Sequence, residues 1–349
     1  MLQQSAGNRV PPELFFEAME RRIGQRCSGG FSVFYIRAAG RVVELRFTSK
    51  ELMAATREQL RWCETEAVKN PDARFFYWND SVGSYLPESH TGAFCLNMDD
   101  RASGAYLRTW PEGRMLAFNP LTRSYYFCEA YKSREEFYRS GHALVLLFSL
   151  WAQDRDLILL HGAAVGEAGE GVLICARGGS GKSTLSIACL LAGLDFVSDD
   201  YVLVSGSGPL RAFPLYSMIC LNPDMYGKLP ELRAPVLSVN HARGDRLLLD
   251  ASGYRFSSGL PIRAVVFPEI TEDRAASFQP MAPGRAMVHL IDSTIHQMGE
   301  NRNTRLVKTI AGRFLNTPVY RMRLGGDPME NACAVGRFIR EDLQHVSNQ

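Results

Sequence analysis

The amino-acid sequence predicts an α/β fold for the C-terminal part of the chain, preceded by an α+β N-terminal domain with antiparallel strands. The chain has 349 residues, more than one packed core usually holds, so two domains are expected. Residues 75–128 form short aromatic runs separated by turn residues, which is typical of an antiparallel sheet. From Leu157 onward, apolar runs alternate with a helix-forming segment, as in a buried α/β core. We place the boundary near residue 132, giving domains 1–132 and 133–349.

Composition excludes several classes of function. Hydrophobic residues make up 46% of the chain and charged residues 22%, which is ordinary for a globular protein. Lys and Arg number 39 against 37 Asp and Glu, and the resulting net charge of +2 gives no strong field to attract nucleic acid or an anionic membrane. We therefore expect neither nucleic acid nor a membrane as a partner.

Cysteine usage and the start of the chain indicate a cytoplasmic protein. The eight cysteines are scattered and form no CxxC pair, so neither a zinc site nor a disulfide framework is expected. The first residues lack the basic and apolar segments of a signal peptide. The longest apolar run, 143–151, is about half as long as a membrane-spanning helix needs to be.

The N-terminal elements follow from periodicity and turn residues. Residues 13–24 come after two prolines and fit a short amphipathic helix. Residues 31–37 and 41–47, on either side of Ala-Ala-Gly, are typical of a hairpin, and 51–69 has a helical period. The aromatic runs that follow, ending near Cys128, would complete the antiparallel sheet.

A helix is expected to connect the two halves of the chain. Ser133 and Glu136 form the S-x-x-E pattern of a capping box, and the apolar segment that follows continues to about Gln153. Beyond this helix, the apolar runs LILL, GVLICA and FVS are the expected core strands.

One segment carries a recognisable chemistry. Residues 171–191 read GVLICARGGSGKSTLSIACLL, an apolar strand, a glycine-rich loop and a helix without proline, which is the context of a phosphate-binding P-loop. Glycine permits backbone angles that aim successive N–H groups at a phosphate, and the helix adds the positive end of its dipole. The expected nucleotide-binding residues are Gly178, Gly179, Ser180, Gly181, Lys182, Ser183 and Thr184.

The P-loop predicts ATP and Mg²⁺ as cofactors. Lys182 is expected to pair with the β- and γ-phosphates, and the Ser183 hydroxyl to bind Mg²⁺. The first glycine of the usual pattern is replaced by Ala176, but Gly178 and Gly179 can still turn the chain.

Two adjacent carboxylates, Asp199 and Asp200, interrupt the apolar segment 195–204. If the strand before them runs parallel to the strand before the P-loop, the acids and the phosphates lie at the same carboxyl edge of the sheet. One carboxylate could then bind Mg²⁺ through water while the other accepts a proton from an attacking hydroxyl group. The residues alone leave open which carboxylate is the base.

The segments LILLHGAAV, ARGGSGKST and FVSDDYVLV resemble the kinase domain of HPr kinase/phosphorylase and its relatives. The resemblance covers about residues 157–325, is most specific over 160–204, and leaves the first 130 residues uncovered. It implies a P-loop kinase core similar to that of phosphoenolpyruvate carboxykinase. It also implies phosphorylation of a serine on a protein or peptide.

The resemblance extends to individual residues. Lys182 and Ser183 match the family's P-loop lysine and metal-binding serine, and Asp199 and Asp200 match its acidic pair. His161 matches the histidine before the P-loop strand, and the resemblance makes it a candidate catalytic residue, although a lone histidine is more often structural. The metal ligands implied are Ser183 and Asp200.

Further along, the match weakens. Arg285, in PMAPGRAMVHL, is weakly similar to the arginine of a family loop that reaches the active site, where it could neutralise charge on the phosphoryl group. A surface arginine at a helix start is an equally good reading. The family's E-I-R-G segment has no counterpart, because FPLYSMICLNP stands in its place. Reverse phosphorolysis, and HPr itself as the substrate, are therefore not expected.

These observations predict an ATP-dependent kinase whose acceptor is a hydroxyl group, with serine of a protein or peptide preferred. A small-molecule kinase is the first alternative, and an ATP-binding regulatory module without phosphotransfer is the second. The acidic pair beside Lys182 favours an enzyme, because binding alone requires no base. The short interval from Lys182 to Asp199 disfavours a P-loop switch or motor ATPase. The N-terminal domain is expected to recognise the acceptor, and a homo-oligomer is left open.

Overall fold

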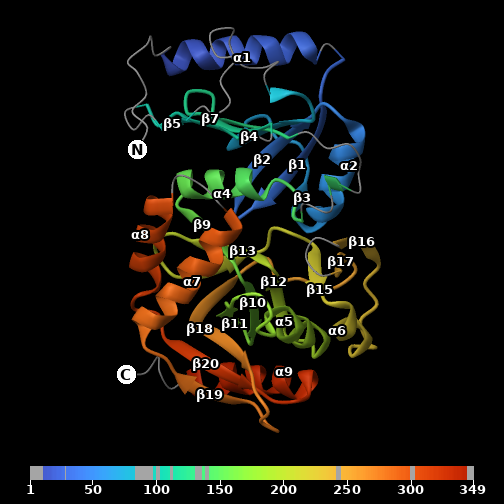
Figure 1. Ribbon diagram of the computed structural model, residues 1–349, viewed down its shortest axis with the longest axis vertical. Helices are drawn as coiled ribbons and strands as arrows, with labels where there is room; N and C mark the ends of the chain where they lie inside the picture. The colour runs from blue at the N-terminus through green and yellow to red at the C-terminus, as the bar shows by residue number, and fades with distance from the viewer. Residues whose placement is uncertain are drawn as a thin grey trace. The chain divides into compact units, whose positions relative to one another are not determined.

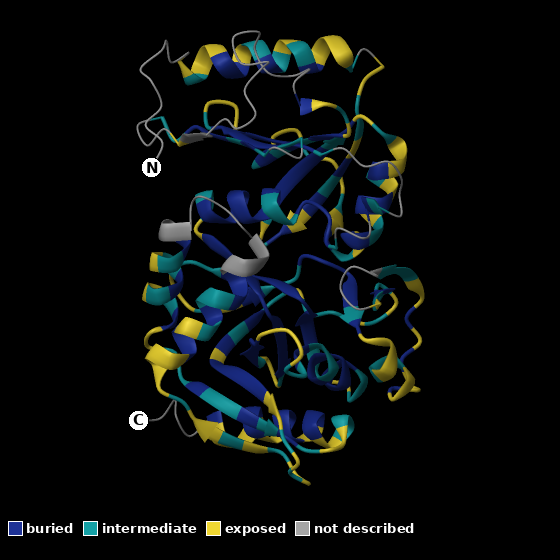
Figure 2. Cartoon of the chain, in the orientation of Figure 1, coloured by how far each residue is buried: buried dark blue, intermediate teal, exposed yellow. Residues whose placement is uncertain are grey.

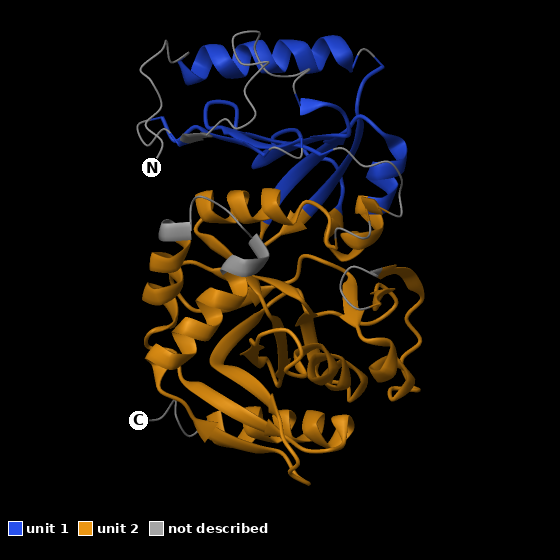
Figure 3. Ribbon diagram, viewed as in Figure 1, with its two compact units in different colours: residues 1–36, 41–55, 65–134 blue, residues 37–40, 56–64, 135–349 orange. Residues whose placement is uncertain are grey.

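The computed structural model describes residues 11–27, 29–82, 97–99, 103–110, 113–129, 136–137, 141–240, 245–298 and 303–343 (Figure 1). The chain forms two compact units (Figure 3). Unit 1 comprises Met1–Ile36, Arg41–Ala55 and Thr65–Arg134, and unit 2 comprises Arg37–Gly40, Thr56–Glu64 and Glu135–Gln349. Within the described ranges, no helix is long and apolar enough to cross a membrane.

The N-terminal sheet has eight strands among the described residues, in the order β3-β1-β2-β4-β8-β7-β6-β5. Its strands are β1 Ser32–Ala38, β2 Arg41–Phe47, β3 Glu64–Thr65, β4 Ala73–Trp78, β5 Asn97–Asp99, β6 Tyr106–Trp110, β7 Arg114–Asn119 and β8 Ser124–Cys128. The expected antiparallel arrangement holds for β5 to β8, but β4 is parallel to both β2 and β8. Parallel neighbours need a long crossover, and helix α2, Lys50–Gln59, lies in the one between β2 and β4.

Helix α1, Pro12–Arg26, packs against the aromatic face of this sheet. Proline stands in its first turn, where the missing N–H costs nothing. Its buried residues Phe15, Phe16, Met19 and Ile23 recur at helical spacing and form one cluster with sheet residues such as Tyr126.

Helix α2 is shorter than the helix expected over 51–69. It ends at Gln59 and is followed by a 3₁₀ turn, Arg61–Cys63, in unit 2. The indole of Trp62 donates to the Ser252 carbonyl at 3.3 Å, and the thiol of Cys63 lies 3.6 Å from the Pro214 carbonyl. These contacts with distant residues override the local helical period.

Unit 2 is an α/β structure built on a mixed sheet with nine strands among the described residues. Seven of them follow the order β12-β10-β11-β18-β14-β13-β9, and β20 pairs with β18 and β19. The strands are β9 Leu157–His161, β10 Ala163–Glu167, β11 Glu170–Ile174, β12 Asp195–Ser198, β13 Tyr201–Ser205, β14 Arg211–Phe213, β18 Leu260–Ile270, β19 Ser277–Pro280 and β20 Val319–Leu324. A separate three-stranded sheet contains β15 Met218–Leu221, β16 Val236–Asn240 and β17 Arg246–Asp250.

Helices cover both faces of the larger sheet. They are α4 Val145–Asp154, α5 Lys182–Leu191, α7 Pro283–Met298, α8 Asn303–Phe314 and α9 Pro328–Arg337, whereas the short helix α6 Pro223–Gly227 follows strand β15 of the small sheet. Val172 and Ile174 on β11 belong to a core cluster with α5 and α9, whereas Leu173 and the following Cys175 belong to a cluster with α7 and α8. The strands are therefore buried on both sides, which explains their uninterrupted apolar runs (Figure 2).

The helix expected from Ser133 to Gln153 is not continuous. Ser133 lies outside the described residues, and α4 begins only at Val145. Leu144 just before it has φ 57°, a left-handed conformation that an α-helix cannot contain. The turn is held by hydrogen bonds at Ala143, whose N–H donates to Gln59 Oε1 at 2.8 Å and whose carbonyl accepts from the Tyr216 hydroxyl at 2.7 Å.

The β10–β11 hairpin provides a test of the packing. A Cβ atom at Gly171 would lie 2.7 Å from the Val165 carbonyl oxygen. We expect Gly171→Ala to lower the free energy of unfolding by about 2 kcal/mol, measured by chemical denaturation. Gly312→Ala, on helix α8 with open space around it, should leave the stability unchanged or raise it by up to about 1 kcal/mol. Equal stability of the two variants would contradict the packing described.

Candidate functional site

The loop between β11 and α5 contains two glycines in the left-handed conformation. Gly179 and Gly181 have φ of 84° and 91°, which glycine adopts without strain. A Cβ atom at Gly181 would also lie 2.7 Å from Leu324 Cδ1. Lys182 is the first residue of α5, so the loop amides are continuous with the positive end of the helix dipole.

The acidic pair lies in a tight turn between β12 and β13. The two strands separate there, since β12 pairs with β10 and β13 pairs with β9 and β14, so 195–204 is not a single strand. Asp200 has φ 66°, and its carbonyl accepts a hydrogen bond from the Gly162 N–H at 3.0 Å. Because β12 is antiparallel to β10 and β10 to β11, β12 runs in the same direction as β11. The acids and the P-loop consequently follow strand ends at the same edge.

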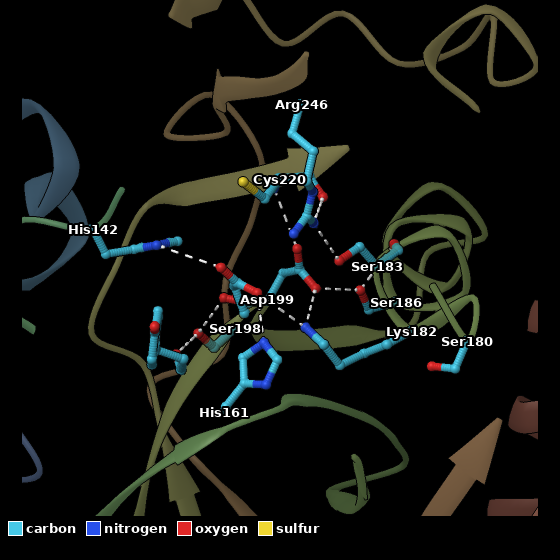
Figure 4. Close-up of polar contacts among 12 residues, drawn as sticks. His142, His161, Ser180, Lys182, Ser183, Ser186, Ser198, Asp199, Cys220 and Arg246 are labelled. Atoms are coloured by element: carbon cyan, nitrogen blue, oxygen red, sulfur yellow. Dashed lines mark hydrogen bonds and ion pairs between the residues drawn. The ribbon is translucent and has the colours of Figure 1, made fainter. Parts of the chain in front are cut away.

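Lys182 lies between the two carboxylates (Figure 4). Its Nζ is 3.3 Å from Asp200 Oδ1 and 3.6 Å from Asp199 Oδ1. The exposed fractions are 6% for Lys182, 0% for Asp199 and 2% for Asp200, so all three charges are buried. Burial alone would lower the pKa of Lys182, but the two carboxylates raise it above its ordinary value, so the ammonium group stays charged.

Two histidines also contact Asp200. His161 Nε2, at the end of β9, lies 3.1 Å from Oδ1, and His142 Nδ1 lies 3.5 Å from Oδ2. Burial alone would raise the pKa of Asp200, but Lys182, His161 and His142 together hold it well below its usual range. The carboxylate is thus ionised at neutral pH. An ionised carboxylate only accepts hydrogen bonds, so His161 Nε2 is the donor.

Asp199 is held differently. Its Oδ1 accepts a hydrogen bond from Ser186 Oγ at 2.9 Å, and its Oδ2 accepts from the Cys220 N–H at 3.3 Å. Both carboxylate oxygens are therefore engaged by the protein itself. Asp199 is not among the residues that line the neighbouring cavity, whereas Asp200 is.

The glycine-rich loop, Lys182, Asp200 and His161 all line one cavity of about 850 Å³. The expected site residues that line it are His161, Gly178, Gly179, Gly181, Lys182, Ser183, Thr184 and Asp200. Ser180 remains in the loop, where its hydroxyl donates to the Arg177 carbonyl at 2.9 Å. The structure does not bring Arg285 to the site, because that residue is exposed in the first turn of α7 and does not line the cavity.

Sequence reasoning missed two basic residues of the site. His142 precedes α4, and its ring lies edge-on to Tyr201 and Tyr216 with centroids 4.9 and 4.6 Å away. Arg246 projects from β17, and its Nη2 lies 3.5 Å from Ser183 Oγ. Neither residue belongs to a motif, so only the folded chain reveals them.

The residues present fit Mg²⁺ bound together with phosphates. In the described part of the chain, no group of three or more His, Cys, Asp or Glu side chains could hold a metal alone. Mg²⁺ does not need such a group, because it commonly takes one or two protein oxygens plus substrate phosphates and water. The Ser183 hydroxyl and the Asp200 carboxylate, both lining the cavity, are suitable oxygen donors.

No protein-family model and no curated protein sequence matches this chain. Among solved structures, the chain is similar to the HPr(Ser) kinase/phosphatase from Coxiella burnetii, with 11% sequence identity and a TM-score of 0.32. The match covers 54% of this chain and 93% of that chain.

The buried charge cluster gives a pH-dependent prediction. Lys182→Met would leave a buried carboxylate without its ammonium partner, so we expect a loss of about 3 kcal/mol or more in unfolding free energy at pH 8. The loss should shrink at pH 5, because Asp200 takes up a proton more readily once the cation that lowers its pKa is gone. Denaturant titrations at both pH values measure the difference.

Lys228→Met is the matched control, because Lys228 is exposed and has no carboxylate partner among the described residues. It should change the stability by no more than about 0.5 kcal/mol at either pH. A Lys182→Met variant as stable as the control would show that the cluster does not contribute as described.

Proposed function

We propose that this protein is an ATP-dependent kinase that transfers the γ-phosphoryl group to a hydroxyl, with a serine of a protein or peptide as the acceptor. The main support for this proposal is that the glycine-rich loop, Lys182 and Asp200 line the same cavity. A phosphate-binding loop alone would serve a binding protein equally well. A buried, ionised carboxylate beside the P-loop lysine adds the group that accepts a proton.

The charge of the cavity favours a polyanion. Among the described residues that line it, four side chains are cationic, namely Arg177, Lys182, Lys228 and Arg246, against the single carboxylate of Asp200. The volume of about 850 Å³ lies within the range of small-molecule and cofactor pockets. A nucleoside triphosphate would match both the size and the excess of positive charge.

Nucleotide binding and base strength are coupled through Lys182. Phosphate oxygens would compete with Asp200 for the ammonium group, since both are anionic partners within its reach. Once Lys182 turns to the phosphates, Asp200 loses the cation that most lowers its pKa and becomes a stronger proton acceptor. The base would thus be activated only when the nucleotide is in place.

The transfer itself then follows from these positions. The acceptor hydroxyl gives its proton to Asp200 as its oxygen forms a bond to the γ-phosphorus, and the bond to the bridging oxygen of ADP breaks in line. His161 would hold the carboxylate in orientation through its 3.1 Å hydrogen bond. Asp199 would keep Lys182 and α5 in place, because its own oxygens are engaged by Ser186 and Cys220.

A bound metal would be held by Ser183, with Asp200 as the second candidate ligand. Mg²⁺ at that place would supply charge neutralisation for the β- and γ-phosphates. We assign Asp200 first to the proton, because three nitrogen atoms already face its two oxygens.

The proposed acceptor follows from the sequence motifs and the N-terminal domain. Serine is proposed from the motifs that resemble protein-serine kinases, and residues 1–132 are proposed to recognise the acceptor because they contain no phosphate-binding loop of their own. A panel of serine peptides compared with small hydroxyl compounds, each incubated with labelled ATP, would distinguish a protein kinase from a small-molecule kinase.

The proposal predicts that ATP binding and phosphotransfer depend on different residues. Asp200→Asn should bind ATP with an affinity close to that of the wild type, while phosphotransfer falls by about 10²- to 10⁴-fold. Lys182→Ala should abolish measurable ATP binding. Calorimetry and transfer of labelled phosphate to an accepted substrate measure the two properties.

Arg263→Ala serves as the control, because Arg263 is on the outside of β18, paired with Glu170 at 2.6 Å, and does not line the cavity. It should behave as the wild type. The Mg²⁺ concentration for half-maximal rate separates the two roles of Asp200: an unchanged requirement in Asp200→Asn supports the base, and a raised one supports the metal ligand. Wild-type turnover in Asp200→Asn would refute both roles.

A further inference from the structure

Among the described residues, Arg246 is the arginine that the small sheet contributes to the lining of the cavity. It lies on β17, and its Nη2 donates to the Cys220 carbonyl at 3.0 Å and lies 3.5 Å from Ser183 Oγ (Figure 4). Its Nε is buried and has no hydrogen-bond partner among the described residues. A buried N–H group without an acceptor lowers the stability of the fold, unless a bound ligand accepts its hydrogen bond.

Of the three other cations among the described residues that line the cavity, two have counter-ions and the third, Lys228, is exposed to solvent. Lys182 is paired with Asp199 and Asp200, and Arg177 with Asp292 at 2.7 Å. Arg246 has no carboxylate within ion-pair distance in the described ranges. Burial raises the pKa of the neighbouring Cys220 thiol to about 12, so this thiol is neutral and provides no counter-ion. A half-buried guanidinium without an ion pair is suited to an anionic ligand.

The position of Arg246 is fixed relative to the acidic pair. The peptide groups of Cys220 link the two, because its N–H donates to Asp199 Oδ2 at 3.3 Å and its carbonyl accepts from Arg246. The small sheet continues this link, since β15 pairs with β17 through Cys220 and Leu248. Arg246 therefore cannot shift without disturbing the strand that also holds Asp199.

The neighbour of Arg246 indicates which part of a nucleotide it would meet. The hydroxyl that follows a P-loop lysine binds the ion shared by the β- and γ-phosphates, so a group near Ser183 Oγ faces that end of the triphosphate. Resting on the proposed function, we propose that Arg246 binds the terminal phosphoryl group of the nucleotide and is a catalytic residue of the transfer. It would thereby take the role that the sequence led us to expect for Arg285.

A guanidinium at this place would act on the transferred group. Its planar donors match two phosphate oxygens, and they would offset the negative charge that spreads over the phosphoryl group during transfer. ADP lacks the group concerned. Arg246 should consequently distinguish ATP from ADP, which a residue that merely supports the sheet would not do.

The test compares the two nucleotides by calorimetry on the full chain, using the wild type, Arg246→Ala, Arg246→Lys and the control Arg263→Ala. We expect Arg246→Ala to bind ATP about 10- to 100-fold more weakly while ADP affinity changes by less than about threefold. Arg246→Lys should lie between, because lysine keeps the charge but not the two-pronged geometry. Added guanidinium ion should partly restore transfer by Arg246→Ala.

The outcomes are distinguishable. Equal losses of ATP and ADP affinity, with no rescue by guanidinium, would overturn the proposal in favour of a structural role that clamps β15 to β17. Unchanged affinity for both nucleotides would also overturn it. If the wild type bound neither nucleotide, the proposed kinase function would itself be wrong, and the role proposed for Arg246, which rests on it, would be overturned as well.

Discussion

The buried ammonium of Lys182 between Asp199 and Asp200 is the interaction on which the site depends. Each of these charges costs several kcal/mol to remove from water, and the cost is offset only if all their hydrogen-bonding positions are filled. The fold supplies partners from separate elements: α5 begins at the lysine, the β12–β13 turn presents the acids, and two histidines, Ser186 and the Cys220 N–H contact the carboxylates. Breaking the contact between Lys182 and the two carboxylates lowers stability, and this is the contact that a bound phosphate would change.

The sequence predicted the parts of this site that are local. The glycines at 179 and 181, the lysine that opens α5 and the adjacent acids each occupy a few consecutive residues, so their chemistry can be recognised without knowing the fold. The alternation of apolar runs likewise predicted a core of buried strands, because helices on both faces of the sheet leave no polar side.

The remainder depends on contacts between distant residues. His142 and Arg246 come from segments about 40 residues or more from the P-loop, and no local pattern links them to it. Arg285 was expected at the site because its loop resembled a known one, but α7 leaves it exposed. The helix expected from Ser133 failed for a related reason: the hydrogen bonds of Ala143 to Gln59 and Tyr216 impose a turn that periodicity cannot reveal.

The most direct measurement of the central claim is the position of Lys182 in a crystal structure of the full chain with Mg²⁺ and a non-hydrolysable ATP analogue. The account predicts that Nζ leaves its 3.3 Å contact with Asp200 Oδ1 and lies within about 3 Å of a β- or γ-phosphate oxygen, with the His161 contact to Asp200 retained. A nucleotide bound away from the loop, or bound with Lys182 still on the acidic pair, would contradict it.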